Sequence, residues 1–182
     1  MDKKLILVSG YCAAGKSTFA RRLAQECGVP CFVKDVIKET MADCFDENGE
    51  NGGDIEAVYR RGSAATFGIM LHVAEMFLAA GQVCVLEGNF KPHEAEALKR
   101  LGADCLSFVF VGDLDVLYDR YVARERHSVH LPAGDRKSFA EGQRRMRYGE
   151  FGVGKVVRVD CTDFGAVDFD GLVEIAKGFV LK

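Results

Sequence analysis

Apolar and polar positions along the chain form two alternating kinds of segment. Short runs of consecutive apolar, partly β-branched residues predict buried strands, at residues 4–9, 30–34, 82–87, 104–111 and 155–160. Helical patterns separate these runs, at residues 16–27, 36–44, about 54–80, 93–101, 114–126, 137–148 and 168–179. Continuous apolar strands that alternate with helices are typical of a parallel sheet covered on both faces. The pattern therefore predicts an α/β protein.

Two loops and one long helical segment interrupt this regularity. The loops are DENGENGGD (46–54), which is rich in acids and turn residues, and HSVHLPAGD (127–135), which contains proline and glycine. The long segment, 54–80, contains Gly62 and Gly68. Because each glycine inside a helix costs about 1 kcal/mol relative to alanine, we expect a kink or a break there.

Composition narrows the class of protein. A chain of 182 residues with 48% hydrophobic and 28% charged residues is most simply one globular domain, spanning 1–182. A net charge of −3 argues against a general binder of nucleic acids or membrane surfaces. No run approaches the roughly 18 consecutive apolar residues of a membrane span, and the first ten residues contain no signal-peptide core. We expect a cytoplasmic protein without a membrane segment, and the oligomeric state stays open.

The turn after the first strand carries the strongest motif. GYCAAGKS, residues 10–17, fits G-x-x-x-x-G-K-[ST], with a strand before it and a helix after it. Its glycines allow successive N–H groups to point at a phosphate, and the helix start adds its positive dipole end. Lys16 supplies a charge for the β- and γ-phosphates, and the Ser17 hydroxyl is a ligand for Mg²⁺. The expected nucleotide-binding residues are Gly10, Tyr11, Cys12, Ala13, Ala14, Gly15, Lys16, Ser17 and Thr18.

Two acidic residues follow neighbouring strands of the predicted sheet. The chain has neither the N-K-x-D or T-K-x-D segment of GTPases nor an apolar strand ending in Asp-Glu, so its short length favours a small kinase. Asp35 follows the second strand and Glu87 ends the third, so both should face the phosphate site. We predict that Asp35 is the base for the acceptor hydroxyl and that Glu87 positions Mg²⁺ through water. The alternatives are a helix N-terminal acid for Asp35 and a strand-end ion pair for Glu87.

Residues 118–148 form a candidate lid. They hold eight of the 24 Lys and Arg residues but only four acids, and the loop 127–135 lies between two arginine-bearing helical patterns. Closure of such a segment brings guanidinium groups onto the phosphates and excludes water. Arg124 and Arg126, nearest the loop, are the predicted phosphate contacts; a solvated helix face is the alternative. His127 and His130 either contact the substrate or stabilise the loop.

These motifs together resemble the small P-loop kinases related to the kinase domain of polynucleotide kinase, chloramphenicol phosphotransferase and zeta-toxin-like enzymes. The resemblance is carried by GYCAAGKST, the Asp35 segment, VLEGNF (85–90) and RYVARERHSVH (120–130), which looks like an Arg-x-x-x-Arg-x-Arg-His lid. It implies a three-layer P-loop NTPase sandwich with strand order 2-3-1-4-5, a requirement for ATP and Mg²⁺, and phosphoryl transfer to a hydroxyl. It also implies that Asp35 activates the acceptor and that Arg124 and Arg126 bind phosphates.

The leading functional hypothesis is an ATP-dependent kinase acting on a hydroxyl of a small molecule. A polynucleotide 5′-hydroxyl kinase is a close variant, for which Arg60, Arg61, Lys99 and Arg100 would extend a basic track. A nucleotide-binding regulator or slow ATPase is an alternative of another class. Residues 36–80 show no pattern tied to one acceptor, and no motif separates ATP from GTP as the donor.

Overall fold

The described residues of the computed structural model form a five-stranded parallel sheet in the order β2-β3-β1-β4-β5. The structure describes residues 3–47, 55–130, 132 and 134–181, with the side chains of 45–47 and 55–61 left out. Both the α/β class and the strand order expected from the sequence are confirmed. From residue 48 on, the predicted loop 46–54 lies outside the described residues.

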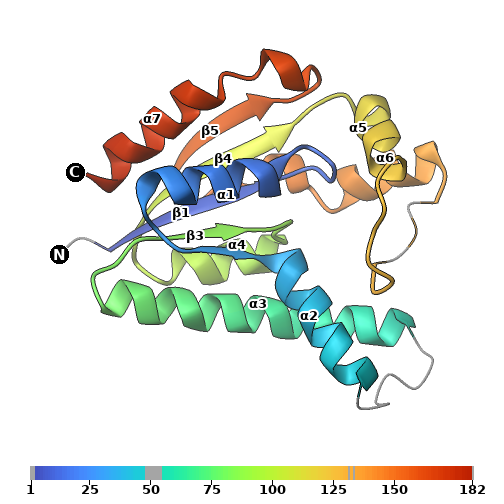
Figure 1. Ribbon diagram of the computed structural model, residues 1–182, viewed down its shortest axis with the longest axis horizontal. Helices are drawn as coiled ribbons and strands as arrows, with labels where there is room; N and C mark the ends of the chain where they lie inside the picture. Colours follow the sequence, from blue (N-terminus) through green and yellow to red (C-terminus); the bar gives the residue numbers. More distant parts are fainter. Residues whose placement is uncertain (1–2, 48–54, 131, 133, 182) are drawn as a thin grey trace.

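Strands and helices alternate along the chain as the apolar pattern predicts, and the parallel strands are joined by helical crossovers (Figure 1). The strands are β1 (Lys4–Gly10), β2 (Cys31–Val33), β3 (Cys84–Glu87), β4 (Asp104–Val111) and β5 (Lys155–Asp160). The helices are α1 (Lys16–Cys27), α2 (Lys34–Glu47), α3 (Ile55–Ala79), α4 (Pro92–Lys99), α5 (Leu114–Val122), α6 (Arg136–Arg145) and α7 (Phe169–Val180), with short 3₁₀ turns η1 (Tyr148–Glu150) and η2 (Phe164–Ala166).

Each face of the sheet is covered by its own apolar cluster. On one face, Ile6 and Val8 pack with α1 and α7 through residues such as Phe19 and Val173. On the other face, alternate positions of the same strands pack with α3 and α4. Figure 1 shows these two helical layers on either side of the sheet, with both termini at one end and α5 and α6 at the other. The carboxyl end of β1 points toward the end of the molecule that carries α5 and α6.

Helix α3 corrects one expectation from the sequence. It runs without interruption over 25 residues, so the break predicted at Gly62 and Gly68 is wrong. A Cβ at Gly62 would lie 3.6 Å from the Lys38 side chain of α2, which shows that α2 packs closely there. Packing between the two helices thus offsets the intrinsic cost of glycine at Gly62, whereas a Cβ at Gly68 would meet no atom within 4 Å.

One stretch of α3 also passes a simple test for a membrane span. Among the described residues, Gly62–Ala79 is long and apolar enough by length and composition, with a mean hydropathy of 1.3 and 22% of it buried. Met70, Ala74 and Leu78 lie in this stretch and are buried. Met70 and Ala74 belong to the apolar cluster on that face of the sheet, so core packing accounts for part of its apolar character.

A buried ion pair ties the start of α2 to α4. The Lys34 ammonium lies 2.6 Å from a Glu94 carboxylate oxygen, and their side chains are 7% and 2% exposed. The other Glu94 oxygen accepts the Lys91 backbone N–H at 2.7 Å. Burial lowers the pKa of Lys34, although the Glu94 charge opposes this shift. The pair fixes the backbone on both sides of the site, since Lys34 precedes Asp35 and also packs against Gly88, which follows Glu87.

We expect Glu94→Gln to lower the free energy of unfolding by about 3–5 kcal/mol, because it leaves the Lys34 ammonium buried without its countercharge. Urea unfolding at pH 7 measures this loss. The control is Glu96→Gln, whose exposed ion pair with Lys99 should contribute at most about 1 kcal/mol. The double variant Lys34→Met/Glu94→Gln should recover most of the stability, because Gln keeps an acceptor oxygen for the Lys91 N–H while the buried charge is removed. Equal effects of Glu94→Gln and Glu96→Gln would contradict the prediction.

Candidate active site

The motif turn joins β1 to α1 in the conformation that phosphate binding needs. Gly10 has φ +125° and Gly15 has φ +85°, and Ala13 also adopts the left-handed region at φ 58°. A Cβ at Gly10 would lie 2.0 Å from the Phe110 carbonyl oxygen, and one at Gly15 would lie 2.2 Å from the Phe164 ring. Both glycines are therefore required by close packing as well as by φ. The turn forms a concave loop at the N-terminus of α1, where free N–H groups and the helix dipole favour an anion.

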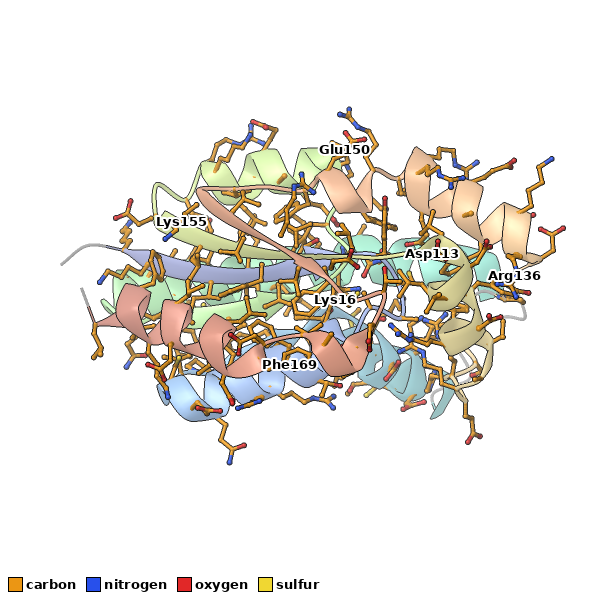
Figure 2. The ribbon with its side chains drawn as sticks, turned by 90° about the horizontal axis from the view of Figure 1, so that it is seen from above. Lys16, Asp113, Arg136, Glu150, Lys155 and Phe169 are labelled. Atoms are coloured by element: carbon orange, nitrogen blue, oxygen red, sulfur yellow. The ribbon has the colours of Figure 1, made fainter. Side chains whose placement is uncertain are left out.

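Lys16 and Ser17 begin helix α1 and contact groups from other segments. The Lys16 ammonium is buried and donates to the Tyr11 carbonyl at 2.6 Å, so it lies across the loop. The Ser17 hydroxyl donates to a Glu87 carboxylate oxygen at 2.9 Å. Figure 2 shows Lys16 near the middle of the molecule.

Glu87 is the last residue of β3 and is only 4% exposed. It lies opposite Val8 of β1 and Val33 of β2, which places its carboxylate beside the motif turn. Burial raises its pKa, while the Lys16 charge and the Ser17 hydrogen bond act in the opposite direction. The Ser17 hydroxyl and this carboxylate are oxygen donors of the kind that Mg²⁺ prefers, so this pair fits the cation that P-loop kinases use.

Asp35 lies in the first turn of α2, immediately beyond β2. About half of its side chain, 51%, stays accessible, and one oxygen lies 3.5 Å from the Lys38 ammonium. Partial burial raises the pKa of this carboxyl, but the charges of Lys38, His130, Lys16 and Arg126 outweigh it, and the pKa is lowered. Asp35 is therefore both a helix N-terminal acid and a carboxylate that stays ionised in a positively charged site.

Two cavities meet at Asp35. The smaller, about 90 Å³, is formed by the motif turn, and the larger, about 230 Å³, lies between the turn, α2 and the lid. The residues that line both are Cys12, Asp35, Asn89 and Arg126. The candidate residues Ser17, Thr18, Glu87 and Arg124 line the smaller cavity. The structure thus brings the predicted base, the predicted metal ligands and the predicted lid arginines to one place.

The lid differs from the sequence prediction in its helix boundary. Helix α5 ends at Val122, before the end predicted at residue 126, so Arg124 and Arg126 lie beyond the helix. The Arg126 guanidinium lies 4.4 Å from the centre of the Tyr121 ring. Arg120 instead donates to the carbonyls of Cys161 and Thr162, at 2.6 and 2.7 Å. The lid arginines that reach the site are therefore those of the loop.

Several residues of the site were missed by sequence reasoning. Gln143 of α6 is buried and accepts the Cys12 backbone N–H at 2.9 Å, which links the lid helix to the motif turn. Asn89 donates to the Cys12 sulfur at 3.2 Å, and Lys38 lines the larger cavity. The signal for Asn89 was its place two residues after Glu87. Gln143 had no local signal, because its partner is 131 residues away.

Comparison with known sequences identifies the family. Residues 6–141 match the family described as AAA domain. The chain belongs to this family. The AAA-domain match spans the motif turn, both acidic strand ends and the lid loop, and it supports the resemblance to small P-loop kinases expected from the sequence.

Part of this AAA-domain chain is similar in sequence to longer proteins. Uncharacterized proteins of Mycobacterium tuberculosis and Mycobacterium bovis are 32% identical to it over 127 residues, which is 66% of the chain. The chain spans about a quarter, 26%, of the length of these relatives.

Solved structures confirm the fold as that of small P-loop kinases. A protein from Chloroflexus aurantiacus, provisionally assigned as a kinase, is 27% identical with a TM-score of 0.80, covering 100% of this chain and 98% of that one. A gluconokinase from Sinorhizobium meliloti is 17% identical with a TM-score of 0.60, covering 98% and 92%. A shikimate kinase from Bacteroides thetaiotaomicron is 16% identical with a TM-score of 0.55, covering 98% of both chains.

Proposed function

We propose that this protein is an ATP-dependent kinase that transfers the γ-phosphoryl group to a hydroxyl of a small molecule. The observation that carries the proposal is the junction of the two cavities, where Asp35 and Arg126 border both. A triphosphate on the motif turn and an acceptor in the larger cavity would meet there, which is the arrangement that direct transfer requires. The small-kinase relatives support the same reaction class.

On the nucleotide side, the N–H groups of the motif turn and of the start of α1 would bind the phosphates. Lys16 would leave the Tyr11 carbonyl and donate to the β- and γ-phosphates. Ser17 and Glu87 would hold Mg²⁺, directly or through water, and the cation supplies positive charge to the phosphate oxygens. Arg124 and Arg126 would add charge from the lid as negative charge develops on the transferring group.

On the acceptor side, Asp35 would accept the hydroxyl proton as the acceptor oxygen bonds to phosphorus and the bond to the leaving ADP oxygen breaks. Its lowered pKa keeps it ionised near neutral pH, so it is ready to accept a hydrogen bond and orient the hydroxyl. After transfer the proton leaves to solvent. Lys38, His130 and Asn89 line the same cavity and are available to polar groups of the acceptor.

The size of the acceptor cavity favours a small molecule. Its volume of about 230 Å³ is below the roughly 300–1,000 Å³ of pockets for drug-sized ligands. Of the basic track expected for the polynucleotide alternative, Lys99 is paired with Glu96 on α4, and the Arg60 and Arg61 side chains lie outside those described. The regulator alternative does not account for the acidic residue at the junction. We also propose the cytoplasmic location expected from the sequence, where ATP is available.

The test of the reaction is ADP release with Mg²⁺ and ATP or GTP against a panel of hydroxyl compounds: sugars, polyols, hydroxy acids, nucleosides and a 5′-hydroxyl oligonucleotide. Release that depends on one small acceptor supports the kinase and names its acceptor class. Release that depends only on the oligonucleotide would replace the proposal with the polynucleotide kinase. Slow release that no acceptor changes would favour the regulator.

We expect Lys16→Ala to abolish acceptor-dependent ADP release while lowering the free energy of unfolding by only about 1 kcal/mol. Among the described residues, the hydrogen bond that this side chain makes is the one to the Tyr11 carbonyl. ADP release and urea unfolding measure the two effects. Arg22→Ala, on the exposed side of the same helix, is the control and should keep its turnover. Near-normal turnover in Lys16→Ala would end the assignment of the nucleotide site.

We expect Asp35→Asn to lower the turnover number by about 10²-fold or more, the scale of general base effects, while ATP affinity is kept. The amide keeps the size of the side chain but cannot take the hydroxyl proton. Turnover and nucleotide affinity, the latter from binding of a fluorescent ATP analogue, separate the two roles. A loss of ATP affinity with unchanged turnover would make Asp35 a metal or structural contact instead.

We expect Lys38→Met to move the acidic limb of the pH–rate profile to higher pH. Among the charges that lower the pKa of Asp35, Lys38 acts most strongly, so its removal raises that pKa. Asp35 then becomes protonated, and activity is lost, at a higher pH as the solution is acidified. The profile of kcat/KM against pH measures the shift. Lys99→Met, which removes a lysine on α4, should leave the limb in place.

A further inference from the structure

The lid loop is fastened to α2 through two histidine–carboxylate contacts. His130 Nε2 lies 2.7 Å from Glu39 Oε1, and His127 Nε2 lies 2.8 Å from Asp43 Oδ1. Glu39 and Asp43 are four residues apart, so they lie on one face of α2, and Asp35 lies one turn before them on that face. Helix α2 therefore presents one acidic residue to the reaction cavities and two to the lid.

The hydrogen bonds around His127 define how it makes its contact. The backbone N–H of Val129 donates to His127 Nδ1 at 3.1 Å, so Nδ1 carries no hydrogen and Nε2 is the donor to Asp43. The ring is thus oriented by its own loop before it reaches α2. His130 is held more deeply: its side chain is 4% exposed, and it also lines the acceptor cavity.

These contacts bear directly on the geometry of the proposed reaction. His127 follows Arg126 in the chain, and Arg126 borders both cavities. On the other side of the contact, Glu39 is one helical turn from Asp35, which borders the same two cavities. A hydrogen bond between the lid loop and this face of α2 therefore limits how far the Arg126 guanidinium can move from the Asp35 carboxylate.

We propose that Glu39 and Asp43, acting through His130 and His127, are positioning residues that hold Arg126 across the phosphoryl-transfer site from Asp35. This inference rests on the proposed kinase function and deepens it. The two histidines hold the lid loop at a fixed position along α2. One face of α2 therefore determines both where Asp35 lies and where Arg126 lies. An acceptor that binds against α2 then encounters a lid already aligned with the phosphates.

The experiment compares Glu39→Ala, Asp43→Ala and the double variant with Asp119→Ala. All three single variants remove one partly or largely exposed carboxylate, so folding is not at stake. Asp119 pairs with Arg136 at 2.5 Å, a contact inside the lid that does not reach α2. Figure 2 shows Arg136 at the outer edge of the molecule, away from Lys16. Asp119→Ala is therefore a matched control for loss of a lid ion pair.

The first readout, amide hydrogen exchange over residues 124–130 in the nucleotide-free protein, is independent of any acceptor. We expect about tenfold faster exchange in the double variant, the scale of losing a hydrogen bond to a charged group, and no change in Asp119→Ala. Glu39→Gln keeps an acceptor oxygen for His130 and should stay close to the unaltered protein. Unchanged exchange in the double variant overturns the proposal.

The second readout is acceptor-dependent ADP release, with the most active acceptor from the panel. We expect about tenfold lower kcat in the double variant and KM for ATP within about threefold, because the motif turn is intact. In an Arg126→Ala background the same two substitutions should change kcat by less than twofold, since their effect runs through Arg126. Faster exchange with unchanged kcat, or full additivity with Arg126→Ala, overturns the positioning role.

Failure of the kinase proposal itself has a different signature. If no acceptor stimulates ADP release by the unaltered protein, the proposed function fails. Exchange over residues 124–130 is then measured with and without Mg²⁺ and a non-hydrolysable ATP analogue. Protection by the analogue that is lost in the double variant and kept in Asp119→Ala supports alignment of the lid on bound phosphates; equal protection in all three proteins overturns it.

Discussion

The parallel pairing of β1 with its two neighbours determines where every polar group of the site lies. Val8 of β1 is opposite Glu87 of β3 and Phe108 of β4, so the carboxyl ends of these strands reach the same edge of the sheet. The motif turn, the Glu87 carboxylate and the start of α2 then meet without any long loop. Two apolar clusters, one on each face of the sheet, hold this register, because a shift of one residue would move every side chain of a strand from the cluster it packs into to the cluster on the opposite face.

Two helices extend this edge into a site with two sides. Helix α1 presents its N-terminus to the motif turn, and α2 presents one face to the lid. The lid helix α6 reaches back to the turn through Gln143, which accepts the Cys12 backbone N–H. Nucleotide side, acceptor side and lid are therefore joined by hydrogen bonds in the free protein, and the lid is ordered around the site in the part of the chain that the structure describes.

The parts of the site that the sequence predicted are those set by local rules. The motif turn is one continuous stretch whose glycines, lysine and serine have fixed spacing. Asp35 and Glu87 could be predicted because they lie at the ends of apolar strands, and the carboxyl ends of parallel strands lie at one edge of the sheet. The sequence could not predict the contact of Gln143 or the partners of His127 and His130, since each contact joins residues at least 84 positions apart. Helix α5 ends at Val122, and α3 is uninterrupted. Both features depend on tertiary packing, which the helix propensities of the residues do not describe.

The buried pair of Lys34 and Glu94 has a consequence for how this chain can change over time. The two residues are 60 positions apart, yet neither is tolerated alone in an apolar environment, where a lone charge is costly. A lineage that replaces one of them must pass through an unstable intermediate or replace both nearly together. Positions 34 and 94 should therefore change together among descendants of this sequence. As long as the pair is kept, the spacing between Asp35 and the edge of β3 is kept as well.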